Sequence, residues 1–277
     1  MNVLRYAAFS DGTSGGNPAG VFLADELPSP DEMQKIAAEI GYSETVFAAR
    51  EWDGHWRTRY FAPDIEIPFC GHATLALGAA LAESVGAGSY PLRLNDTEIT
   101  VEAHVARDVF RAALQSPPTR SLPADDACVS AACELFSLAA SDLEPKIPPA
   151  IAEAGATHLI LGLASRDALS RALPYDLDRG QALMKKWGLG TICLVTPVSD
   201  RDFAVRNAFA AGGVMEDPAT GAAAAALAGY LRDLNWNHGN CIEVAQGDDM
   251  GIPCRIKAEL SSVPNSSIRI AGTVRSI

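Results

Sequence analysis

Residues 72–82 read HATLALGAALA, and residues 220–231 read TGAAAAALAGYL. Both stretches have helical length and carry apolar or small residues on every side. A surface helix has one apolar stripe, whereas a helix that is apolar all round is buried. The sequence therefore predicts two buried helices, one in each half of the chain.

The two stretches also have similar lead-ins. The segment RYFA (59–62) precedes the first, and RNAFA (206–210) precedes the second. Cys70 follows Arg59 by eleven residues, and Asp217 follows Arg206 by the same number. This spacing indicates an internal duplication, in which each half wraps a curved sheet around one helix. The N-termini of the two helices are then expected to face a shared cleft.

The remaining pattern predicts an α+β protein of two lobes. Strands are expected to flank the buried helices, and a surface helix is expected after Ser29, where Pro30 and Glu32 complete a capping box. Residues 116–123 are rich in proline and are the predicted linker. The predicted lobes are residues 1–115, joined by a final strand at 266–277, and residues 124–262.

Composition excludes some partners. The chain has 277 residues and a formal net charge of −12, which argues against a nucleic-acid partner because phosphate binding needs a basic surface. Apolar runs are too short to span a membrane, and residues 1–6 lack a signal pattern. We expect a cytoplasmic protein with no membrane partner.

No cofactor or metal motif is present in the sequence. The six cysteines form no C-x-x-C pair, so they are expected to be unpaired thiols rather than zinc ligands. The Gly-rich run at 12–20 lacks the Gly-Lys-Ser/Thr ending of a phosphate loop. We expect an enzyme that uses its own acids and bases, with no cofactor and no metal.

Three places could carry such chemistry. Cys70, Gly71 and His72 lie at the start of the first buried helix, where backbone N–H groups attract carboxylates, although the residue types alone favour a plain helix cap. Asp217 before Pro218 has the pattern of an N-cap, which is its simpler explanation.

Glu44 is the third candidate. It stands between a predicted helix end at Gly41 and a strand, and a single Glu in such a loop is usually solvated. Burial favours the protonated form of a carboxyl group, so a buried Glu44 would suit a general base working near neutral pH.

The chain resembles the PhzF-like family of phenazine biosynthesis, which shares its fold with diaminopimelate epimerase and proline racemase. The matching segments run in family order over nearly the whole chain: GNPAGV (16–21), SETVF (43–47), RYFAP (59–63), FCGHAT (69–74), RN (206–207), EDPATG (216–221) and QG (246–247).

The resemblance implies a diaminopimelate epimerase-like fold and a cofactor-independent isomerase acting on a small, carboxylate-bearing, cyclic amino acid-like substrate. Glu44 is the implied proton-transfer residue, assisted by His72 and Asp217. It further implies a homodimer. The predicted substrate-binding residues are Asn17, Ser43, Cys70, Gly71, Ala73, Thr220, Gly221 and Ala222.

Two departures from the family pattern concern the substrate. Ala222 stands where many relatives have Ser, and Ile252 stands where relatives often have Arg. The alternatives are an epimerase or racemase of an amino acid derivative, a ligand-binding protein without activity, and an enzyme with Cys70 as nucleophile. The two-thiol mechanism of the epimerases that share this fold is disfavoured, because Asp217 occupies the expected place of the second cysteine.

Overall fold

A computed structural model describes residues 3–277. The chain divides into two compact units, after Gln115 and before Ala271. Unit 1 contains the described residues up to Gln115 together with Ala271–Ile277, and unit 2 contains Ser116–Ile270. Residues 1 and 2 of the predicted first lobe lie outside the described residues.

Unit 1 is a closed β-barrel around one helix. Its elements are β1 (Leu4–Ser10), β2 (Asn17–Ala24), α1 (Pro30–Ile40), β3 (Glu44–Arg50), β4 (Trp56–Phe61), β5 (Glu66–Ile67), α2 (Gly71–Val85), β6 (Gly88–Arg93), β7 (Glu98–Ala106), β8 (Val109–Gln115) and β17 (Arg269–Ser276). Pairing runs β1–β2–β3–β4–β6–β7–β8–β17 and returns to β1, with parallel pairs at β2–β3 and β4–β6.

Helix α2 forms the centre of unit 1. Every residue from His72 to Ala82 is buried, and the helix packs against β1, β2, β3, β7 and β8. The prediction of a helix buried on all sides is confirmed. Outside the barrel, α1 begins with the predicted capping box of Ser29 and Glu32 and ends at Gly41 in the left-handed conformation.

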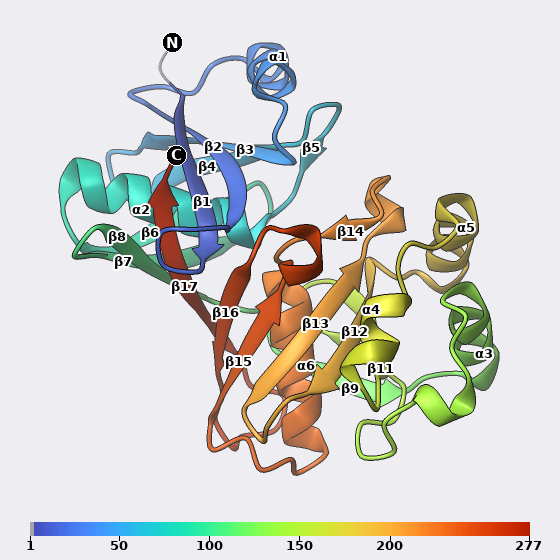
Figure 1. Cartoon of the computed structure of the whole chain (residues 1–277). Helices are drawn as coiled ribbons and strands as arrows, with labels where there is room; N and C mark the ends of the chain where they lie inside the picture. The colour runs from blue at the N-terminus through green and yellow to red at the C-terminus, as the bar shows by residue number, and fades with distance from the viewer. Residues whose placement is uncertain (1–2) are drawn as a thin grey trace. The chain divides into compact units, whose positions relative to one another are not determined.

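Unit 2 is a mixed sheet with helices on both faces (Figure 1). Its elements are β9 (Arg120–Pro123), α3 (Asp126–Leu135), β10 (Ala150–Glu153), β11 (Thr157–Gly162), α4 (Arg166–Arg171), α5 (Leu177–Trp187), β12 (Thr191–Pro197), β13 (Asp202–Ala208), β14 (Glu216–Asp217), α6 (Gly221–Asp233), β15 (Cys241–Gln246) and β16 (Cys254–Glu259). Short 3₁₀ helices are η1 (Ala140–Asp142), η2 (Ala210–Gly212) and η3 (Asp248–Met250).

The second predicted buried helix is α6, which packs against β9, β10, β11 and β16. On the other face, alternate residues of β11 and β12, among them Leu159, Leu161 and Leu194, pack with α3, α4 and α5 in a second core. The residues predicted as a linker, 116–123, include β9, which pairs with β10. Proline did not prevent this, because Pro123 ends the strand.

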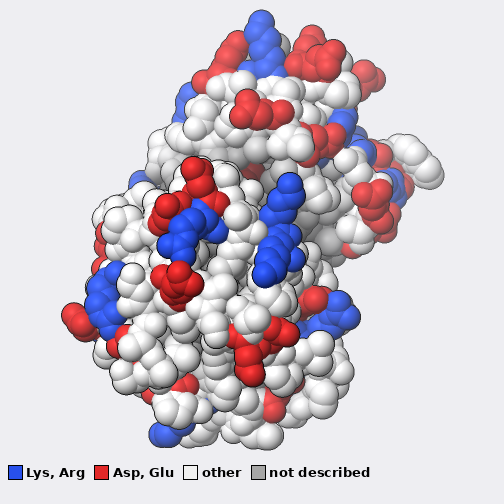
Figure 2. Space-filling view, turned by 90° about the vertical axis from the view of Figure 1, so that its right-hand side faces the viewer, with Lys and Arg blue, Asp and Glu red and all other residues white. Residues whose placement is uncertain are grey.

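Several charged side chains on the surface form ion pairs. Arg93, for example, forms ion pairs with Glu51, Asp53 and Glu98. Figure 2 shows basic and acidic groups interspersed on one face of the molecule. No helix within residues 3–277 combines the length and the apolar character needed to cross a membrane.

Candidate active site

Glu44 and Asn17 lie at the starts of two neighbouring strands in unit 1. Glu44 is the first residue of β3 and Asn17 is the first residue of β2. These strands run parallel, with Ala19 opposite Glu44. Because both residues begin parallel strands, their side chains lie at the same end of the barrel. Asn17 is 2 % exposed, and the Glu44 side chain is 15 % exposed.

His72 meets Glu44 from the first turn of α2. Its Nε2 lies 3.3 Å from Oε2 of Glu44. The distance suits an ion pair, yet the angles fall outside hydrogen-bond geometry, and neither buried atom has a hydrogen-bond partner among residues 3–277. Buried polar atoms are normally hydrogen-bonded, so two such atoms facing each other mark a place for a ligand.

The other nitrogen of His72 identifies its tautomer. Nδ1 lies 3.4 Å from Nδ2 of Asn17 and 3.3 Å from Sγ of Cys70. The amide Nδ2 can only donate, so Nδ1 accepts and the ring proton of neutral His72 is on Nε2. That nitrogen is the one that lies 3.3 Å from Glu44.

Glu44, Cys70 and His72 also form a possible metal-ligand set, with ligand atoms within 4.8 Å of one another. However, Glu44 approaches the Nε2 side of the ring and Cys70 approaches the Nδ1 side. One imidazole cannot turn both nitrogens toward one ion. The arrangement suits proton transfer through the ring better than metal coordination.

Asp217 ends β14 in unit 2, and it is not the helix cap that its sequence predicts. Helix α6 begins at Gly221, with Thr220 as N-cap. Pro218 therefore lies before the helix rather than in its first turn. Asp217 is tied to the helix start because Oγ1 of Thr220 donates to its Oδ2.

The predicted equivalence of Cys70 and Asp217 is wrong by three residues. Cys70 and Thr220 are the two helix N-caps. In the strands before them, Ile67 lies opposite Tyr60 as Asp217 lies opposite Asn207. The cause is the loop between β13 and β14, residues 209–215, which contains η2 and is three residues longer than its counterpart at 62–65.

Matching ion pairs hold these loops in the two units. Arg206 binds Glu216 through two hydrogen bonds of 3.0 and 2.6 Å, and Arg59 binds Glu66 through two of 2.8 and 2.6 Å. The pair in unit 2 is the more buried, with side-chain exposures of 11 % and 4 %. Each pair fixes the short strand that leads to a buried helix.

The other predicted binding residues lie beside these. Ser43 is exposed immediately before β3. Gly71 and Gly221 are the first residues of α2 and α6, where backbone N–H groups have no partner within the helix. Ala73 is fully buried, and Ala222 is half-buried in the first turn of α6.

The sequence predicted no role for several polar residues of unit 2. Gln246 donates from Nε2 to the carbonyl oxygen of Asp217 at 2.7 Å, and its Oε1 accepts from the N–H of Thr220 at 3.3 Å. His158 and Thr191 are also buried in this unit. The signal for them was a polar residue within an apolar strand, as in HLILG (158–162).

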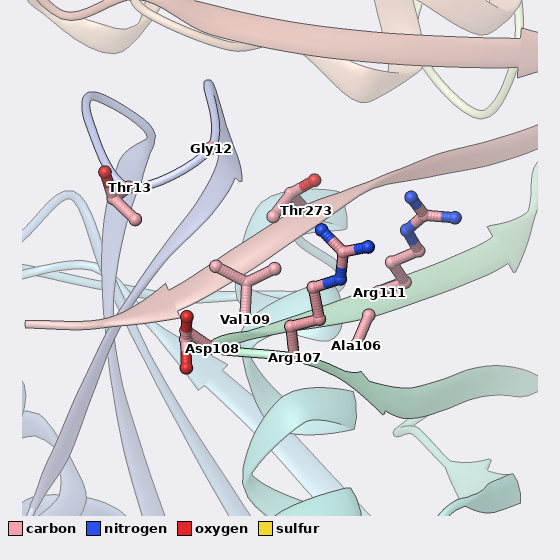
Figure 3. Close-up of a pocket in the computed structure, with 8 residues that line it drawn as sticks. All are labelled: Gly12, Thr13, Ala106, Arg107, Asp108, Val109, Arg111 and Thr273. Carbon is pink, nitrogen blue, oxygen red and sulfur yellow. The ribbon is translucent and has the colours of Figure 1, made fainter.

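A separate pocket lies on unit 1, between the β7–β8 hairpin, the β1–β2 loop and β17 (Figure 3). Arg107, Arg111 and Thr273 are among its lining residues. Arg107 and Arg111 are exposed, and no predicted site residue lines the pocket.

Comparison with known proteins gives a consistent result. A family model described as phenazine biosynthesis-like protein (PhzC-PhzF) matches residues 6–275. The chain is 32 % identical over 264 residues to an "uncharacterized isomerase" of Deinococcus radiodurans, covering 92 % of this chain and 85 % of that protein. It is also 32 % identical over 280 residues to the trans-2,3-dihydro-3-hydroxyanthranilate isomerase of Pseudomonas fluorescens, covering 98 % and 95 %.

Solved structures show the same fold. The phenazine biosynthesis protein, PhzF family, of Bacillus anthracis aligns with a TM-score of 0.86 at 22 % identity, over 100 % of this chain and 98 % of that one. A probable proline racemase of Agrobacterium radiobacter aligns with a TM-score of 0.66 at 11 % identity, over 99 % and 90 %. The predicted epimerase-like α+β fold is confirmed.

Proposed function

We propose that this chain, which belongs to the phenazine biosynthesis-like (PhzF) family and is an isomerase, moves a proton on a small, carboxylate-bearing, cyclic amino acid-like substrate. Glu44 is the proton-transfer residue of this proposal. The observation that carries it is the facing pair of buried atoms, Oε2 of Glu44 and Nε2 of His72, which lack hydrogen-bond partners among the described residues.

The pair supports a different role for each of its two residues, Glu44 and His72. A carboxylate is the acceptor that can take a proton from an activated C–H group and return it to another carbon. His72 carries its proton on Nε2, so it donates to an oxygen or amine of the substrate beside that carbon. Asn17 keeps the ring in this tautomer.

Binding of the substrate carboxylate is assigned to helix N-termini. Gly71 and Gly221 occupy first helical positions, where N–H groups and the helix dipole attract anions. The N–H of Thr220 is engaged by Gln246, so Gly221 is the better donor in unit 2. We further propose a catalytic role for Asp217.

These groups suffice for a carbon-acid reaction. Positioned acid–base transfer contributes about 10²–10⁴ in rate, and each preorganised oxyanion donor contributes about 10²–10³. No redox step is needed, because substrate and product differ only in the place of a proton and a double bond.

The test is proton NMR in D₂O with trans-2,3-dihydro-3-hydroxyanthranilate, the compound in the name of the Pseudomonas relative. Wild type, Glu44→Gln and the control Glu39→Gln, which changes an exposed residue of α1, are compared. We expect rearrangement with deuterium uptake in wild type and control, and a loss of at least about 10² in Glu44→Gln. Full turnover by Glu44→Gln would overturn the mechanism.

Other outcomes would favour the alternatives. Loss of optical rotation without a change in ultraviolet absorbance would indicate an epimerase. Tight binding of a cyclic amino acid without deuterium exchange would indicate a ligand-binding protein without activity.

A thiol mechanism is favoured by one observation, the 3.3 Å contact of Cys70 Sγ with His72 Nδ1. A helix N-terminus and a neighbouring imidazole both promote the thiolate. Cys70→Ala separates the two mechanisms, because it should leave a Glu44-dependent reaction within a few-fold of wild type. Loss of turnover in Cys70→Ala together with full turnover in Glu44→Gln would support the thiol mechanism instead.

A further inference from the structure

A path of four hydrogen bonds crosses unit 2 and ends on Asp217. Nδ1 of His158 lies 2.7 Å from Oγ1 of Thr191. Thr191 donates to Oδ1 of Asn207 at 3.0 Å, and Nδ2 of Asn207 donates to Oγ1 of Thr220 at 2.6 Å. Thr220 donates to Oδ2 of Asp217. We call these four bonds the His158–Asp217 path.

The strand registers build this path. His158 on β11 lies directly opposite Thr191 on β12, and Asn207 on β13 lies directly opposite Asp217 on β14. His158, Thr191 and Asn207 are 1 %, 4 % and 0 % exposed. Buried hydrogen bonds between neighbouring strands are rigid, so the path is a fixed support rather than a surface contact.

The donors of the path all point toward Asp217. Thr191 has one hydroxyl proton and gives it to Asn207, so its contact with His158 requires a proton on Nδ1. Burial lowers the pKa of His158 to about 4, so the ring is neutral at pH 7 and carries this single proton. Its Nε2 is buried and has no hydrogen-bond partner among residues 3–277, so a proton relay would have no continuation there.

Residues of unit 2 occupy every hydrogen-bonding site of the Thr220 hydroxyl group. Its Oγ1 accepts from Asn207 and from Nε2 of Gln246 at 3.2 Å, and donates to Asp217. A hydroxyl offers one donor and two acceptor sites. The side chain of Thr220 therefore has no capacity left for the substrate that the family resemblance assigned to it.

The start of α2 in unit 1, which corresponds to the start of α6, is fixed by different hydrogen bonds. Tyr60 and Thr74 share a hydrogen bond of 2.7 Å, and Thr74 donates to the carbonyl oxygen of Cys70 at 2.7 Å. That arrangement ends on the backbone. A path that ends on a carboxylate is thus not a general requirement of starting a buried helix in this fold.

We propose that the His158–Asp217 path positions Asp217 for catalysis. It commits Oδ2 as an acceptor from Thr220 and so fixes the orientation of the carboxylate. The residues of the path are positioning residues, and Thr220 acts through Asp217. This proposal rests on the proposed function for the role of Asp217, but the orientation of the path can be tested without a substrate.

The first test measures the path in the unmodified protein. Long-range ¹H–¹⁵N spectra of histidine-labelled protein at pH 7.5, with His158→Gln for assignment, report the tautomer. We expect His158 to be protonated at Nδ1 and bare at Nε2. A proton on Nε2 would reverse the path and overturn the proposal.

The second test breaks the path at Thr191. In aspartate-labelled protein, the ¹³Cγ resonance of Asp217, assigned by its loss in Asp217→Asn, should shift in Thr191→Val and return in Thr191→Ser. Thr196→Val is the matched control, because Thr196 is a buried threonine of the same strand that bonds the carbonyl oxygen of Ser165. An unchanged resonance in Thr191→Val would overturn the proposal.

Steady-state turnover tests whether the path positions Asp217 for catalysis. With a confirmed substrate, Thr191→Val should lower kcat about tenfold or more, as expected for a misplaced catalytic group, with KM within twofold. Thr191→Ser should recover most of it, and Thr196→Val should match wild type. A protein with the expected spectra but no turnover would contradict the proposed function while retaining the path.

Discussion

Nε2 of His72 lies 3.3 Å from Oε2 of Glu44, a contact between the first turn of α2 and the first residue of β3. Both residues are carried by regular elements of one barrel, and regular elements hold side chains more precisely than loops do. The spacing of the two atoms should therefore be sensitive to small changes in side-chain length.

Glu44→Asp tests this sensitivity. The substitution retracts the carboxylate by one methylene, so the distance to His72 grows although the charge is kept. A displacement of about 1 Å can lower the rate about 10²-fold, and we expect a loss of that order in kcat for deuterium exchange. Glu39→Asp on the exposed face of α1 is the control. Equal rates for all three proteins would show that the position of Glu44 is unimportant.

Asn17→Asp should reverse the tautomer of His72. A carboxylate at this place accepts from Nδ1, so the ring proton leaves Nε2 and no longer faces Glu44. We expect turnover to fall at least about tenfold, while Asn17→Ser loses less. ¹⁵N spectra of His72 check the cause directly, and a proton that stays on Nε2 in Asn17→Asp would refute this account.

The ion pairs of the two units should differ in their contribution to stability. Arg206→Ala leaves Glu216 buried without its partner, which typically costs about 3–5 kcal/mol of unfolding free energy. Arg59→Ala affects a more exposed pair, with side chains 18 % and 27 % exposed, and should cost about 1 kcal/mol. Urea unfolding of both variants provides the comparison. The double variant Arg206→Ala/Glu216→Ala should recover part of the loss, and its failure to do so would assign the loss to other contacts of Arg206.

Acid should destabilise the fold through His158. Burial lowers its pKa from 6.5 to about 4, so between these values the unfolded chain binds more protons than the native one. Stability is then complete above about pH 6.5 and is lost as pH falls toward 4, by about 3 kcal/mol in total.

His158→Gln should flatten this dependence, although it lowers stability at pH 7.5. His104→Gln, at an exposed position, should leave the dependence unchanged. Urea midpoints at several pH values measure both. A His158→Gln variant with the full acid dependence of wild type would place its origin elsewhere.

Buried thiols should resist alkylation. Burial raises the pKa of Cys193 to about 12 and also raises that of Cys128, and only the thiolate reacts. Iodoacetamide at pH 7.5 should leave both unmodified in native protein and modify both in urea, as peptide mass spectrometry can show. Rapid native labelling of Cys193 would contradict the burial described above.

The two central helices could be predicted because an all-apolar helix has only one stable environment. The capping box at Ser29 and the strand start at Glu44 followed from local chemistry in the same way. The approach of His72 to Glu44 could not, since it depends on the parallel pairing of β2 and β3 and on the position of α2 inside the barrel. No local pattern encodes such contacts between distant segments.

The place of Asp217 was missed for a different reason. Equal spacing suggested that it corresponds to Cys70, but a loop three residues longer in unit 2 moves the helix start to Thr220. From the sequence alone, a longer loop before this helix cannot be distinguished from an N-cap at an earlier residue, because both segments carry turn-forming residues. The buried partners Thr191 and Asn207 were likewise missed, because their hydrogen bonds join residues of different elements.

The barrel of unit 1 is closed by β17, which pairs with β1 and β8. All of unit 2 except Arg269 and Ile270, which begin β17, lies between β8 and this strand in the chain. During synthesis the first unit must therefore wait, with the edges of β1 and β8 open, until the ribosome has made the whole of the second. Exposed strand edges invite pairing with other chains, so unit 1 is open to such pairing until β17 has been made.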